Sequence, residues 1–218
     1  VPLHQKRLVI KAKKARKPVI TATQMMESMI DSLTPSRAEV NDVANSVMDG
    51  ADAMMLSGET SLGQFPVEVV KTIEKIIHRV EGSPLIKTPH DLPNIASKRL
   101  LTKTVCFHAC NIANEIRASA ICTLTNSGYT AWQISSWRPN AMILVFTSNK
   151  KILAQLNLLW GVKCMFYDNF ISTDKTIEEV NIIAKKQGFL KKGALVINLS
   201  AMPILEKGEV NTLRVSKI

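Results

Sequence analysis

The chain has 218 residues, of which 46% are hydrophobic and 21% are charged. This composition is ordinary for a globular protein and excludes global disorder, and the length suits one or two domains. No apolar run approaches the roughly 20 residues that a membrane helix needs, and the first residues hold no signal-peptide core. We therefore expect a cytoplasmic protein without a membrane partner.

The net charge of +10 comes mainly from one short segment. Residues 1–17 contain seven basic side chains and no acidic one, so the rest of the chain is nearly balanced. Leu8, Ala12 and Ala15 are spaced as on one face of a helix, which predicts an amphipathic helix with a solvated basic face. Nucleic-acid binding is the alternative, but no helix-turn-helix, zinc or RNA-binding signature supports it. We expect no nucleic-acid partner.

Four cysteines, Cys106, Cys110, Cys122 and Cys164, form neither a C-x-x-C pair nor a zinc-like cluster. The four histidines are scattered without ligand spacing. We expect buried free thiols and no transition-metal site built by this chain.

The first block is predicted to alternate helices and strands. Its second helix has clear limits, because Ser36 and Glu39 form a capping box and Gly50 suits the C′ position. Its third helix opens at Pro66. Val70 is expected on the buried face of that helix, and Val40 on the buried face of the second. The predicted strands cover residues 18–21 and 51–56, and the first helix covers residues 3–16.

The second block also alternates, which favours α/β architecture. Its strands are predicted at residues 120–125, 141–147, 162–167, 194–199 and 210–215, and its helices at 94–117, 130–137, 150–159 and 173–187. A proline-rich stretch without periodicity separates the two blocks. The predicted domains are therefore residues 1–82 and 94–218, joined by a linker at 83–93.

The two blocks differ in completeness. The second has about five strands and four helices, enough for an independent layered domain. The first has two strands, whereas a closed (β/α)₈ barrel takes about 250 residues. It can supply only the last quarter of such a barrel, and alone it would leave strand edges unpaired.

Small polar side chains follow both predicted strands of the first block. Thr23 and Gln24 follow one strand, and Ser57, Glu59 and Thr60 follow the other. A hydroxyl at the carboxyl end of a barrel strand can hydrogen-bond a substrate carboxylate or an enolate, so Thr23 is the catalytic candidate and the others support it. The alternative is that all of them bond locally as caps and turns.

A second candidate site lies where the strand at 120–125 meets the next helix. A glycine-containing turn at a helix N-terminus presents free amides and suits a phosphate, although ordinary N-caps use the same residues. The residues concerned are Thr125, Asn126, Ser127, Gly128, Tyr129 and Thr130.

Two long motifs carry a family resemblance. KPVITATQMMESM (residues 17–29) and PSRAEVNDVANSVMDGADAMMLSGETSLGQFPVEVV (residues 35–70) closely resemble the pyruvate kinase family. The resemblance implies an α/β fold: the C-terminal part of a TIM barrel, over residues 1–82, followed by the layered α/β C-terminal domain, which is the allosteric domain of the family.

The family implies a glycolytic phosphotransferase that makes pyruvate and ATP from phosphoenolpyruvate and ADP. The resemblance assigns Thr23 to substrate contact, and it assigns the catalytic lysine and the Mg²⁺ and K⁺ ligands to earlier barrel strands outside this chain. We therefore expect the isolated chain to be inactive. The alternative is a non-catalytic regulatory or oligomerisation module.

The resemblance also implies a homo-oligomer, usually a tetramer, and places a sugar-phosphate effector at residues 125–130. That loop contains no lysine or arginine here. Activation by fructose 1,6-bisphosphate is therefore doubtful, and any phosphorylated effector remains an open alternative.

Overall fold

A computed structural model describes residues 2–22, 24–83, 98–204 and 208–218. The chain divides into two compact units, Val1–Lys87 and Thr88–Ile218, and each unit is described by itself. Except for Ser83, the predicted linker lies outside the described residues, so the predicted domain limits stay a prediction.

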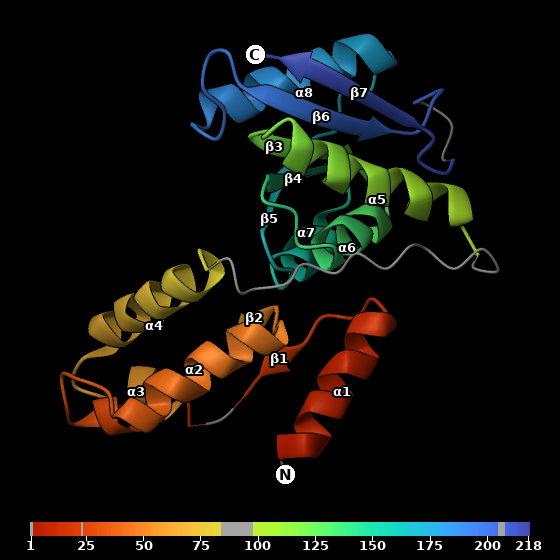
Figure 1. The fold of residues 1–218 in the computed structure, drawn as a ribbon. Coiled ribbons are helices and arrows are strands. Elements are labelled where there is room, and N and C mark those ends of the chain that lie inside the picture. The colour runs from red at the N-terminus through yellow and green to blue at the C-terminus, as the bar shows by residue number, and fades with distance from the viewer. Residues whose placement is uncertain (1, 23, 84–97, 205–207) are drawn as a thin grey trace. The chain divides into compact units, whose positions relative to one another are not determined.

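The first unit alternates helices with two very short strands (Figure 1). Strands β1 and β2 pair in parallel and form a sheet of two strands within the described residues. The predicted alternation is confirmed, although each strand is shorter than expected because only one neighbour is there to pair with. The elements are α1 (Pro2–Lys14), β1 (Ile20–Thr21), η1 (Glu27–Ile30), α2 (Arg37–Asp49), β2 (Ala53–Met54), α3 (Gly58–Ser61) and α4 (Pro66–Glu81).

Helix α2 has the ends that its sequence predicts. The Ser36 side chain accepts a hydrogen bond from the Glu39 backbone N–H, and the Glu39 carboxylate accepts one from the Ser36 N–H at 2.8 Å. Gly50 ends the helix with a φ of 90°. At that end the Lys6 ammonium lies 2.6 Å from an Asp49 carboxylate oxygen, and Lys13 Nζ donates to the Asp49 carbonyl at 3.3 Å. Part of the basic face of α1 therefore binds the negative end of α2.

The first unit has its own small core between α2, α4 and the segment around η1. Two predicted core positions are wrong: Val70 is 51% exposed and Val40 is 37% exposed. Helix α4 buries Val69 at its N-terminal end instead of Val70, whereas Ile73 of the predicted stripe is buried as expected. The buried residues of this core are Met25, Met26, Met29, Val43, Val69 and Ile73.

The second unit is a five-stranded sheet in the order β5-β4-β3-β6-β7. The first four strands are parallel, and β7 pairs antiparallel with β6 at one edge. Figure 1 shows helices on both faces of this sheet. The elements are α5 (Leu100–Glu115), β3 (Ala120–Leu124), α6 (Tyr129–Ser136), β4 (Met142–Thr147), α7 (Lys150–Leu156), β5 (Val162–Phe166), α8 (Thr173–Lys186), β6 (Leu195–Ser200) and β7 (Thr212–Lys217).

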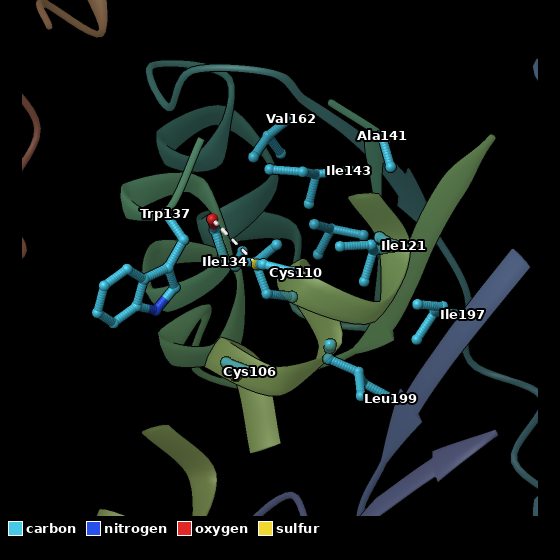
Figure 2. Packing of buried hydrophobic residues seen from close by; sticks show 14 of the residues in the cluster. Cys106, Cys110, Ile121, Ile134, Trp137, Ala141, Ile143, Val162, Ile197 and Leu199 are labelled. Atoms are coloured by element: carbon cyan, nitrogen blue, oxygen red, sulfur yellow. Dashed lines mark hydrogen bonds between the residues drawn. The ribbon is translucent and has the colours of Figure 1, made fainter. Parts of the chain in front are cut away.

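Successive residues of the central strands enter two different cores, as the two-residue period of a strand requires. Figure 2 shows one core, in which Ile121, Ile143 and Ile197 from three strands meet Cys110 of α5 and Ile134 of α6. The opposite face packs against α8 and contains Ala120, Cys122, Leu144, Phe146, Val180, Ala184 and Val196.

The described residues include no helix that is long and apolar enough to cross a membrane. The cysteines are free thiols, as predicted, and three of the four are buried.

Candidate functional site

The first candidate site lies at the carboxyl edge of the β1–β2 pair. Ile20 pairs with Ala53 and Thr21 with Met54 in parallel register. The segments that follow β1 and β2 therefore leave the pair at the same edge, as the sequence predicts. Thr23 itself lies outside the described residues. Gln24 is exposed and has a φ of 46°.

The turn after β2 is closed by local hydrogen bonds. Glu59 is only 2% exposed, and its Oε2 accepts a hydrogen bond from the Ser57 N–H at 2.9 Å. The Ser57 carbonyl accepts hydrogen bonds from the hydroxyls of Thr60 at 3.2 Å and Ser61 at 3.0 Å. The turn interpretation thus accounts for Thr60. It does not account for Glu59 Oε1, which is buried and has no partner among the described residues.

The turn after β2 thus places the Glu59 carboxylate and the Ser57 backbone at the carboxyl edge of the strand pair. Burying a carboxylate oxygen without a hydrogen-bond donor costs free energy. Glu59 Oε1 is therefore placed to accept a hydrogen bond from a group outside the described residues. Among the described residues, no group of three or more His, Cys, Asp or Glu side chains is arranged to hold a metal ion.

The second candidate site is the turn between β3 and α6. Gly128 has a φ of 78°, and a Cβ there would lie 3.0 Å from Leu156 Cδ2, so any other residue would be strained at this position. The Gly128 N–H donates to Thr125 Oγ1 at 3.0 Å, and the Tyr129 N–H donates to Ser127 Oγ at 3.4 Å. Two loop hydroxyls are therefore already used in local bonds.

Groups from outside the loop lie beside this second site, and sequence reasoning missed them. The Arg99 guanidinium stacks over the Tyr129 ring, 4.8 Å from its centroid. Asn149 Nδ2 donates to the Asn126 carbonyl at 3.2 Å and so joins the turn after β4 to the turn after β3. Arg99 precedes α5 and is far from the loop in sequence, so no local motif signals the contact.

Three of the four cysteines are unsuited to act as nucleophiles. Burial raises the pKa of the Cys106 and Cys122 thiols to about 12, and that of Cys164 to about 11. At neutral pH all three are protonated and therefore poor nucleophiles.

Two family models match the chain. Residues 1–70 match the pyruvate kinase barrel domain, and residues 103–216 match the pyruvate kinase alpha/beta domain. The second match alone spans more than half of the chain.

Curated relatives and a solved structure agree with these matches. Pyruvate kinase 2 of a Synechocystis strain is 40% identical over 90% of this chain, and the Clostridium acetobutylicum pyruvate kinase is 37% identical over all of it. The crystal structure of a pyruvate kinase from Cryptosporidium parvum superposes on 99% of this chain, with a TM-score of 0.86 and 29% identity.

The chain spans less than half the length of these proteins. It covers 33% of the Synechocystis protein, 46% of the Clostridium protein and 43% of the Cryptosporidium chain. The similarity nevertheless runs through both units, with their strands and helices in the family's order. The chain belongs to the pyruvate kinase family.

Proposed function

We propose that this chain forms the C-terminal part of a glycolytic pyruvate kinase and contributes one side of its active site. The reaction transfers a phosphoryl group from phosphoenolpyruvate to ADP and yields pyruvate and ATP. The observation that carries the proposal is the parallel register of β1 and β2, within the part of the chain that matches the barrel domain. That register brings the carboxyl ends of β1 and β2 to one edge, and in the proposal Thr23 and Glu59, which follow these strands in sequence, act from that edge.

The proposed role of Thr23 is to hold the substrate, with its hydroxyl donating to the carboxylate or to the enolate oxygen of the reacting molecule. Glu59 and Ser57 shape the neighbouring turn, and Gln24 lies beside Thr23 in sequence. Glu59 acts through position: its Oε2 fixes the Ser57 N–H, and its free Oε1 receives a donor from elsewhere in the barrel.

The family's Mg²⁺ does not fit the described residues of this chain. No described acidic cluster can ligate a divalent ion, so we derive no step through a metal here. In this proposal the catalytic lysine and the metal ligands come from barrel strands outside this chain. The isolated chain is then inactive, which a lactate-dehydrogenase-coupled assay with phosphoenolpyruvate, ADP, Mg²⁺ and K⁺ checks directly.

The decisive test is a covalent chimera. In the Clostridium acetobutylicum pyruvate kinase, the region that matches this chain is replaced by this chain, and turnover is measured in the same coupled assay. We expect activity. We also expect Thr23→Ala to lower kcat by on the order of 10²-fold, with Thr23→Ser partly active. Thr34→Ala, at an exposed threonine in the same unit, is the matched control.

Two results would overturn this assignment. One is a folded chimera without turnover, and the other is a chimera in which Thr23→Ala and Thr34→Ala have the same effect. Turnover by the isolated chain would contradict the proposed origin of the lysine and the metal ligands.

A second function, binding of a phosphorylated metabolite, is supported by Arg99 beside residues 125–130. The guanidinium over Tyr129 supplies the cation that the loop sequence lacks, at the N-terminus of α6. The proposed contacts are turn amides other than those of Gly128 and Tyr129, the Thr130 hydroxyl and Arg99.

Titration calorimetry of the full chain with fructose 1,6-bisphosphate, and with inorganic phosphate, tests this second function. Arg99→Ala should weaken binding by on the order of tenfold. Arg117→Ala, which removes the same charge just beyond the other end of α5, should leave it unchanged. No heat with either probe, or equal losses in both variants, would reject the site.

We further propose that the parent enzyme is a cytoplasmic homo-oligomer and, in keeping with its family, a tetramer. Light scattering of the active chimera measures its mass directly. A monomeric active species would contradict this proposal.

A further inference from the structure

Among the described residues, no further strand pairs with either outer edge of the β1–β2 pair. The Ala53 N–H donates to the Val19 carbonyl at 3.3 Å, and the Met55 N–H donates to the Thr21 carbonyl at 2.8 Å. In this parallel register the N–H and C=O of Ile20 point away from β2, and those of Met54 point away from β1. Ile20 therefore offers one donor and one acceptor to a further strand.

A hollow of about 880 Å³ lies alongside the outer edge of β1. One wall is a single stripe of α1 that includes Leu8 and Ala12, and the other is the segment 18–22, which contains β1. Leu8 is 67% exposed and Ile20 is 47% exposed, so apolar side chains from both walls face solvent.

The position of α1 indicates what fills this hollow. A helix that connects two parallel strands packs over both of them, and α1 comes directly before β1. The place beside β1 and beneath α1 is therefore that of the parallel strand preceding α1. The matched barrel domain requires such strands, and more than half of the Clostridium protein lies outside the matched region.

The first unit forms its own core and helix caps without a strand in the hollow beside β1. It has its own core around Met26 and Met29, and both ends of α2 are capped. The Asp52 carboxylate accepts a hydrogen bond from the Val19 N–H at 2.8 Å, which fixes the start of β1 against β2. A partner strand can therefore pair with the edge of β1 that is already in place, and the first unit does not depend on that strand in order to fold.

We propose that the groove between α1 and β1 is a docking surface that binds the remaining β/α units of the barrel even when they are supplied as a separate polypeptide. The partner has a defined chemistry. It presents a parallel strand with apolar side chains toward Leu8 and Ile20, which line the groove and face solvent. This inference rests on the proposed function and adds that the barrel assembles without a covalent link.

Two separate polypeptides test it. The full 218-residue chain is mixed with the part of the Clostridium acetobutylicum pyruvate kinase that lies outside the matched region, each at about 10 µM. Association is measured by light scattering and titration calorimetry, and turnover is measured by the coupled assay. We expect a one-to-one complex of the two chains that acquires turnover.

Three variants locate the docking surface. Leu8→Asp places a charge in the groove. Ile20→Pro removes the outward N–H and leaves the hydrogen bonds between β1 and β2 in place. Each should weaken association at least tenfold. Leu62→Asp is the control, because Leu62 is 83% exposed and does not line the groove. Circular dichroism checks that each variant is folded.

The outcomes separate this proposal from the proposed function. A complex that the two groove variants weaken supports docking, whether or not turnover appears. An active covalent chimera combined with no association of the separate chains overturns docking and leaves the proposed function standing. Docking is also overturned if the Leu8→Asp and Ile20→Pro chains are folded and still associate with the partner as tightly as the Leu62→Asp control does.

Discussion

The two units of this chain differ in how completely their strands are paired and covered. In the second, five strands pair continuously and helices cover both faces, so the central strands contribute to two separate cores. In the first, two strands of two residues each pair only with one another among the described residues, and a groove lies open beside them. The contrast shows that helix caps and local packing can form half of a site without closing the sheet that carries it.

The largest expected effect lies in the complete unit. Phe146 is fully buried on β4, and its ring lies edge-on to Tyr167 with centroids 6.3 Å apart. Phe146→Ala should lower the free energy of unfolding by about 3–5 kcal/mol. All three tryptophans are in the second unit, so their fluorescence during urea unfolding reports the change. Met142→Ala, at an exposed position of the same strand, should cost much less.

A smaller effect is expected where α1 meets α2. Gly50→Ala puts a Cβ at a φ of 90°, which should cost about 1–2 kcal/mol, and the Cβ would lie 2.2 Å from Lys13 Nζ. Gly188→Ala is the matched control, because φ is 80° there and a Cβ would have no atom within 4 Å. Hydrogen exchange of α1 should increase in the Gly50 variant only. Equal protection of α1 in both variants would show that the lysine contact contributes nothing.

The capping box gives the next effect. Burial acts to raise the pKa of Glu39, but hydrogen bonds from Ser28 and Ser36 outweigh it and hold the pKa below the usual 4.5. The resulting stabilisation is present above pH 4.5 and is lost as the pH falls through the lowered pKa. Glu39→Gln should therefore cost about 1 kcal/mol at pH 7 and less in acid. The same loss at both pH values, or a similar loss for exposed Glu74→Gln, would contradict this account.

A further effect distinguishes the two units by their response to pH, since all four cysteines lie in the second one. The thiols of Cys106 and Cys122 have folded pKa values of about 12, above the usual 9.0. The folded state keeps these protons while the unfolded chain releases them, so stability falls as the pH rises above 9. The tryptophan-detected urea midpoint should drop between about pH 8 and about pH 10. A Cys106→Ala, Cys122→Ala double variant should show a smaller drop; an identical drop would exclude the thiols as the cause.

Much of the fold could be predicted from local chemistry. Ser36, Glu39 and Gly50 set the ends of α2, and Pro66 set the start of α4, because caps depend on neighbouring residues. The motifs also placed the chain in its family. The buried face of α4 could be predicted only in part: Ile73 is buried as expected, but the choice between Val69 and Val70 depends on how the helices pack.

The candidate sites were predictable only in part. The common edge for the segments after β1 and β2 follows from parallel pairing, which the alternating pattern signals. The buried Glu59 oxygen and the stacking of Arg99 on Tyr129 depend on tertiary contacts that no local pattern encodes. The contact of Thr23 with substrate stays a prediction.

Hydrogen exchange of the two sheets in one sample tests the contrast between the units most directly. In the isolated chain, peptides covering β1 and β2 should exchange much faster than peptides covering β3 and β6. Adding the separate Clostridium segment should slow the exchange of β1 and β2 and leave β3 and β6 unchanged. Equal protection of the two sheets before the segment is added, or no slowing of β1 afterwards, would contradict the account.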